Sequence, residues 1–171
     1  LFDRLIRYLL QNRYSVMAID LPEHGLSSGI YGELDDFSHY AQVIDELFDA
    51  VAEHIPGPWL ALGQSTGGAA LMRYLFFPDH AARIQKLVLL APLILPYGSR
   101  GVSLLYYLLR PFVTKVPRKF PKGTHDPEFN YRLKHVDPLQ PRYVAVRWVK
   151  AMLGWAAKFA SLPHSQMPVK V

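Results

Sequence analysis

The ten residues Trp59–Gly68 (WLALGQSTGG) decide the fold. They open with an apolar run that does not alternate with polar residues, which is typical of a strand buried on both faces of a sheet. Gly63 ends that run, and Ala69–Phe77 then carries small and apolar residues suited to a helix. The stretch therefore predicts a strand, a tight turn and a helix, with Ser65 at the turn.

The turn itself indicates why a serine would stand there. A serine hydroxyl attacks substrate only when it is presented by the fold, deprotonated by a base and assisted by donors to the oxyanion. A turn this tight leaves no room for side chains two residues before and after the serine, which favours glycine at 63 and 67. We therefore predict that Ser65 is a nucleophile.

Its neighbours complete the predicted site. The backbone N–H of Thr66 is expected to donate to the oxyanion, and Gly68 is expected to let the helix approach the sheet. Gly63, Gln64 and Gly67 form the rest of the turn. Two other interpretations remain open: a glycine-rich turn with an incidental serine, and a phosphate-binding loop, although the lysine and spacing of a P-loop are missing.

Outward from this turn, strands and helices alternate. Tyr14–Ile19 is a β-rich run followed by a loop over Leu21–Gly29, and a helix with a 3.6-residue apolar period follows Asp35 and Asp36. Lys86–Ala91 is the next apolar strand. This alternation predicts a parallel sheet with helices on both of its faces.

The second half has a different character. From Pro96 to about Pro163 the chain is rich in proline, aromatic and basic residues, with helical patterns at Ser103–Leu109 and Tyr143–Phe159. We interpret it as a helical cap inserted between sheet strands. The predicted division is a core over 1–97, a cap over 98–165 and the start of the next core strand over 166–171.

Both ends suggest a longer sequence. The chain opens at Leu1, inside an amphipathic helical pattern and without an initiator methionine. It closes on Met167–Val171, which looks like a proline-led entry into a buried strand. We expect a fragment that is truncated at both ends.

Composition narrows the functional classes. The 171 residues contain no cysteine, which excludes thiol catalysis and fits a reducing, cytoplasmic setting. The net charge of +5 is concentrated after residue 97, but no base-reading motif accompanies it, so we expect no nucleic-acid partner. The longest apolar runs are shorter than the roughly 20 residues that span a bilayer. Peripheral membrane contact through the basic, apolar cap stays an expectation.

No pattern indicates a metal or a cofactor. The histidines at 39, 54, 80, 125 and 135 lack metal-ligand spacing. Asp126, Asp137 and His164 follow Ser65 in the chain order of a catalytic triad. They fall within the predicted cap, however, and not at the ends of sheet strands, so we expect structural or surface roles for them.

Two motifs together carry a resemblance to a known family. Residues 20–27 (DLPEHGLS) and 63–68 (GQSTGG) resemble the α/β-hydrolase superfamily, and within it the lysophospholipase and monoacylglycerol lipase-like group named serine aminopeptidase S33. That group has Asp-x-x-Gly-His-Gly-x-Ser in the first motif, and Glu23 stands here in place of its first glycine. The resemblance covers nearly the whole chain and implies a doubly wound parallel sheet, present in part, with an inserted cap.

The resemblance also implies a function. The family order is serine, then an acid after a strand beyond the cap, then a late histidine, and both partners would lie past Val171. The implied reaction is hydrolysis of a lipid-like ester, such as a lysophospholipid or monoacylglycerol, through an acyl-serine, with no cofactor. Residues 1–171 alone are expected to be inactive. The alternatives are an S33-type aminopeptidase and a non-catalytic binding protein with the same fold.

Overall fold

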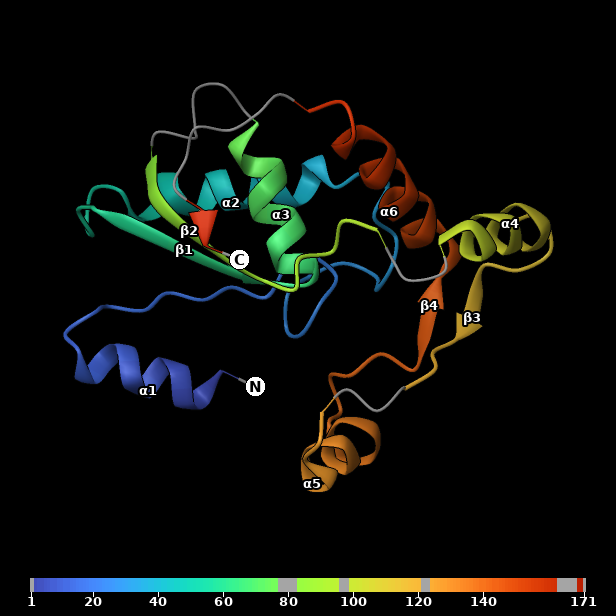
Figure 1. Ribbon diagram of the computed structural model, residues 1–171, viewed down its shortest axis with the longest axis horizontal. Coiled ribbons are helices and arrows are strands. Elements are labelled where there is room, and N and C mark those ends of the chain that lie inside the picture. The colour runs from blue at the N-terminus through green and yellow to red at the C-terminus, as the bar shows by residue number, and fades with distance from the viewer. Residues whose placement is uncertain (1, 77–82, 96–98, 121–123, 163–168, 171) are drawn as a thin grey trace.

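The computed structural model describes residues 2–76, 83–95, 99–120, 124–162 and 169–170 (Figure 1). Two helices come first, helices and strands then alternate from residue 59 to 109, and a mixture of short strands and helices follows up to residue 159. The helical elements are α1 (Asp3–Gln11), α2 (Ser38–Val51), α3 (Thr66–Leu75), α4 (Ser99–Leu109), α5 (Pro127–Tyr131), a π-helical turn (Arg132–Val136) and α6 (Val146–Phe159). The strands are β1 (Trp59–Gln64), β2 (Ile84–Leu90), β3 (Lys115–Pro117), β4 (Tyr143–Ala145) and β5 (Val169–Lys170).

The main sheet has the parallel order β1-β2-β5. Gly63 in β1 lies opposite Leu89 in β2, and Leu87 in β2 lies opposite Val169 in β5. Parallel neighbours need a crossover, and α3 makes the one between β1 and β2. The predicted parallel α/β sheet is confirmed. Of the strand expected after residue 166, only residues 169 and 170 are described, and they pair with Leu87 and Val88 of β2.

The hydrophobic core lies between the sheet and the helices α2 and α3. Tyr40 and Ile44 in α2 are buried, as are Ala70 and Tyr74 in α3. Figure 1 shows both helices on the same face of the sheet. Apolar residues at helical spacing drive this packing, because burying them removes their surface from water.

The other face of β1 differs from the prediction. Burial alternates along the strand, with Leu60 49% and Leu62 39% exposed, whereas Gly63 is buried. Because successive strand residues point to opposite faces, the helices on one face bury only every second position. The expectation that β1 is buried on both faces is therefore wrong for the part of the chain that the structure describes.

The segment Tyr14–Ile19 does not form the predicted strand. It is irregular, and Tyr14, Val16, Met17 and Ile19 are each at least 36% exposed. A strand exists only through hydrogen bonds to a neighbouring strand, and no described strand pairs with this segment. Its β-rich composition could not supply that neighbour.

Residues 99–162 contain more than the two predicted helices. The helix expected over Ser103–Leu109 is confirmed within α4, which begins four residues earlier. The helix expected from Tyr143 begins only at Val146, because Tyr143–Ala145 forms the strand β4, antiparallel to β3. The Val146 N–H donates to the Thr114 carbonyl 2.9 Å away, so the strand pairing continues to the first residue of the helix. No described helix is long and apolar enough to cross a membrane.

The helix α6 joins the hydrophobic core of the sheet. Trp155 is 1% exposed, its ring stacks on Phe37 at a centroid distance of 6.1 Å, and its indole N–H donates to the Leu93 carbonyl at 2.8 Å. Two ion pairs tie the same helix to the segment before α2: Arg147 to Asp35, and Lys158 to Asp36. The segment 99–162 is thus anchored to the rest of the protein through α6.

The ion pair between Asp36 and Lys158 predicts that the stability of the protein depends on pH in the acidic range. Desolvation raises the pKa of Asp36, but hydrogen bonds from Lys158 and Ser38 outweigh it and lower the pKa to about 2, below its ordinary value of 3.8. An acid whose pKa is lower in the folded state stabilises the fold above its unfolded pKa. That stability should be lost as pH falls from about 4 to about 2. Urea unfolding across this range should show a smaller loss in Asp36→Asn than in the wild type, and equal losses would contradict the prediction.

Candidate active site around Ser65

Ser65 occupies a sharp turn between β1 and α3. Its backbone has φ 49° and ψ −115°, a conformation that residues other than glycine rarely adopt. Three main-chain hydrogen bonds hold it there: its N–H donates to the Leu90 carbonyl at 3.1 Å, and its carbonyl accepts from Leu93 at 2.9 Å and Ala69 at 3.1 Å. The residue is exposed. The fold therefore holds this serine in a strained conformation and presents it to solvent.

The glycines around Ser65 differ in how much space is available for a side chain. A Cβ at Gly63 would lie 2.7 Å from the backbone of Gly67 and Gly68, and a Cβ at Gly68 would lie 2.9 Å from the Pro92 side chain. A Cβ at Gly67 would meet nothing within 4 Å. The expected clash at Gly67 is therefore wrong. The helix start crosses over Gly63, so the space at 63 and 68 is restricted, but a side chain at 67 would point away from both contacts.

Thr66 and Gln64 flank the serine. Thr66 is the first residue of α3, and the first N–H groups of a helix have no partner within it. Such groups can donate to an anion that forms at the serine. Gln64 ends β1, is exposed and lies opposite Leu90. The positions suit the predicted roles, which stay predictions.

Strain at Ser65 leads to a stability prediction. Glycine enters the positive-φ region without the cost that a Cβ imposes, which is about 1–3 kcal/mol for a strained residue. Ser65→Gly should therefore raise the free energy of unfolding by about 1 kcal/mol, because part of the relief is offset by the entropy of glycine in the unfolded chain. Ser65→Ala keeps the Cβ and should change it little. Urea unfolding of the two variants checks this, and a less stable glycine variant would contradict it.

The loop over residues 20–27 is closed on Asp20. The Asp20 carboxylate accepts from the Leu26 N–H at 2.9 Å, and the Asp20 carbonyl accepts from the Ser27 hydroxyl at 2.6 Å. A Cβ at Gly25, where φ is +55°, would lie 2.2 Å from the Asp20 carboxylate, so this position needs glycine. The family-like residues of this loop are thus explained by its own geometry.

Glu23 departs from the glycine of the family motif, and its backbone has φ 67°. The left-handed conformation costs a residue with a Cβ about 1–2 kcal/mol. Burial outweighs the hydrogen bonds from the main chain of residues 32–34 and raises the pKa of the Glu23 carboxyl. The Oε2 atom of Glu23 is buried without a hydrogen-bond partner. Glu23 therefore combines a strained backbone with a partly unsatisfied carboxyl group.

The candidate triad partners within the chain have structural contacts. Asp126 accepts from the N–H groups of Glu128 and Phe129 at the start of α5, and Asp137 accepts from the Leu139 N–H. His164 lies outside the described residues. The His24 ring is bonded through Nδ1 to the Pro22 carbonyl at 3.0 Å, and its edge contacts two tyrosine rings. Among the described residues, no histidine is hydrogen-bonded to the Ser65 hydroxyl, and no group of His, Asp or Glu side chains could hold a metal ion.

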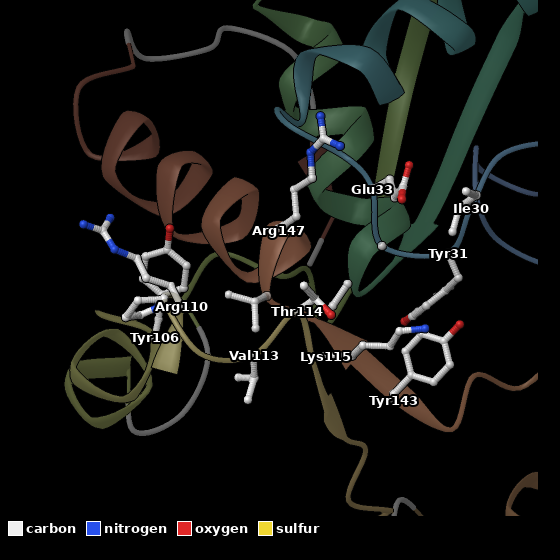
Figure 2. A pocket seen from close by; sticks show the side chains of 14 residues that line it. Ile30, Tyr31, Glu33, Tyr106, Arg110, Val113, Thr114, Lys115, Tyr143 and Arg147 are labelled. Atoms are coloured by element: carbon white, nitrogen blue, oxygen red, sulfur yellow. The ribbon is translucent and has the colours of Figure 1, made fainter. Parts of the chain in front are cut away.

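The structure contains a cavity of about 710 Å³ that no sequence pattern predicted (Figure 2). It lies between the loop 30–33, the chain from Arg110 to Lys115, and the start of α6 with β4. Ser65 does not line it. The basic and tyrosine residues there come from segments far apart in the sequence, so only the folded chain brings them together.

A strand, a strained and exposed serine, and a helix crossing closely over the strand define the α/β-hydrolase class. The chain matches the family described as serine aminopeptidase, S33, over residues 1–169, and so belongs to that family.

Two solved structures share the fold. A monoacylglycerol lipase from Paleococcus ferrophilus superposes with a TM-score of 0.77 at 21% identity, over 98% of this chain and 65% of the lipase. A soluble variant of monoglyceride lipase from Saccharomyces cerevisiae, in complex with a substrate analog, gives a TM-score of 0.70 at 23% identity, over 92% of this chain and 55% of that one. The chain therefore spans between half and two thirds of these lipases.

Proposed function

We propose that the protein is a serine hydrolase that cleaves lipid-like carboxylic esters, such as a monoacylglycerol or a lysophospholipid. The observation that carries the proposal is the backbone of Ser65, which is strained at φ 49° and exposed. Strain of this kind persists only where the surrounding structure enforces it, and it concentrates at functional sites. Membership of the S33 family and the fold shared with two lipases support the choice of substrate class.

In the proposed reaction the Ser65 hydroxyl oxygen attacks the ester carbonyl carbon, and a base takes its proton. The Thr66 N–H stabilises the negative charge that forms on the carbonyl oxygen. The bond to the alcohol then breaks, the alcohol leaves with a proton, and an acyl-serine remains. Water hydrolyses the acyl-serine to the carboxylic acid and restores Ser65. Neither the base nor the acid that orients it is assigned to a described residue.

A fluorophosphonate probe tests the nucleophile directly, because it reacts covalently with activated serines. The whole protein should be labelled, and Ser65→Ala should abolish the labelling. Ser161→Ala is the matched control, since Ser161 is also exposed but its hydroxyl donates to the Lys158 carbonyl. Labelling that survives in Ser65→Ala would disprove the proposal.

The family description itself favours a second candidate, an aminopeptidase that uses the same serine. The two reactions share the nucleophile and differ in the leaving group. Comparing p-nitrophenyl esters with aminoacyl anilides separates them: faster turnover of the esters supports the esterase, and faster turnover of the anilides supports the peptidase.

The proposal includes a cap over residues 98–165, above a core formed by residues 1–97, and contact of that cap with membrane lipid. Leu104, Leu108 and Phe112 are exposed, Phe112 to 84%, and the basic residue Arg110 lies among them. Apolar side chains flanked by cations suit an anionic lipid surface. Binding to phosphatidylserine vesicles that Phe112→Ser weakens would support this contact, and unchanged binding would oppose it.

A further inference from the structure

The cavity described above is built from two parts of the chain that are locked together. Gly32, with φ +85°, packs so closely on β4 that a Cβ there would lie 2.3 Å from the Ala145 Cβ. The loop 30–33 and β4 therefore form adjoining walls of fixed spacing. Ile30 and Val113 line the cavity with apolar surface. A volume of about 710 Å³ is within the usual range of small-molecule sites.

Charge is distributed unevenly around this cavity. On one side of the cavity, the charge of Arg147 is neutralised by its ion pair with Asp35 and by the nearby negative charge of Glu33. In Figure 2 the side chain of Arg147 points away from Lys115. Lys115 instead lies over an aromatic ring, with its Nζ 4.4 Å from the centroid of Tyr143. The positive charge is therefore neutralised on the side of Arg147 and is not neutralised on the side of Lys115.

The positive side has donors that converge. The rings of Tyr31 and Tyr143 are 6.1 Å apart, and Figure 2 shows Lys115 extended toward both of them. Burial raises the pKa of Tyr31, so its hydroxyl keeps its proton and can donate it to an anion. Among the described residues, no carboxylate forms an ion pair with Lys115.

Two acidic residues lie near the cavity. Glu33 lines it and acts electrostatically on Arg147, and burial raises the pKa of the Glu23 carboxyl. Neither forms an ion pair with Lys115. An anion at Lys115 would therefore not compete with a carboxylate for that cation. It would receive charge-assisted hydrogen bonds, which are the stronger kind.

We propose that this cavity binds an anionic single-chain amphiphile, with its carboxylate or phosphate head group at Lys115, Tyr31 and Tyr143 and its chain against the apolar lining residues, among them Val113. The inference goes beyond the proposed ester hydrolysis. It does not depend on Ser65, because that residue does not line the cavity. Failure of one proposal therefore leaves the other standing.

Calorimetric titration of the whole protein with short-chain probes tests the site. Octyl phosphate or octanoate should bind, whereas the neutral octyl glucoside should bind at least tenfold more weakly. Binding of both anions, or of only one, supports the proposal and identifies the head group. Equal binding of the neutral amphiphile would overturn it, as would inorganic phosphate that binds as tightly as octyl phosphate.

Matched variants locate the binding. Lys115→Gln should weaken binding of the anionic probes about tenfold, equivalent to about 1.4 kcal/mol. Lys115→Arg should keep most of the affinity because it keeps the charge. Lys119→Gln removes the same charge from an exposed residue that does not line the cavity and should change little. Urea unfolding confirms that each variant folds, and an equal loss in the Lys119 variant would overturn the assignment.

Discussion

Replacing Gly63 by alanine should destabilise the protein by about 3 kcal/mol, the upper end of the usual cost of forcing extra atoms into a packed site. The new Cβ would lie 2.7 Å from the backbone of Gly67 and Gly68, and a main chain yields less readily than the end of a side chain. Relief would require the start of α3 to move away from β1. Because Ser65 lies at that junction, the same movement should also reduce labelling of the serine.

Gly67→Ala is the matched control for this prediction. It adds the same methyl group four residues away, meets nothing within 4 Å, and lies in the first turn of a helix. Alanine favours helix by up to about 1 kcal/mol over glycine, so this variant should be as stable as the wild type or slightly more stable. Urea unfolding of both variants measures the contrast. Equal destabilisation would show that the turn needs glycine at both positions.

That contrast marks the limit of motif reasoning at the turn. The motif correctly predicted a strand, a tight turn and a helix, because all three depend on local sequence: the apolar run Trp59–Leu62, a glycine after it and helix formers beyond. The motif also places glycine at position 67. Which glycine is sterically required depends on how the helix crosses the strand, and that angle is not a local property.

Features that depend on a distant neighbour were not predictable. Tyr14–Ile19 has the composition of a strand, but composition does not supply the strand that it would pair with. Tyr143–Ala145 continues a helical spacing of aromatic residues and yet pairs with Lys115–Pro117, about thirty residues earlier. The cavity at Lys115 has the same origin, since Tyr31 and Tyr143, which both line it, are separated by more than a hundred positions.

Trp155→Ala should destabilise the protein by about 3–5 kcal/mol, the usual cost of truncating a fully buried tryptophan. The residue is 1% exposed, stacks on Phe37 and contacts the edge of Phe159. Its loss would leave a cavity and would also leave the Leu93 carbonyl without the indole donor. Thermal or urea unfolding measures the change.

A second variant of Trp155 separates the contributions to this cost, and a change elsewhere in α6 serves as the control. Trp155→Phe keeps an aromatic ring against Phe37 but removes the N–H, and should cost about 1–3 kcal/mol for the unpaired carbonyl and the lost volume. Lys150→Ala changes an exposed residue of the same helix and should be nearly neutral. If Trp155→Ala were as mild as the lysine variant, α6 would not be part of the core.

The shape of the unfolding curve tests the same packing. Phe37 precedes α2 in the first half of the chain and Trp155 belongs to α6, so the two segments share one hydrophobic cluster. Segments that share a core unfold together, whereas independent units show separate transitions. We expect a single transition that moves to lower urea in Trp155→Ala without splitting. A first transition that leaves the signal of Trp59 in β1 unchanged would show instead that α6 detaches while the sheet stays folded.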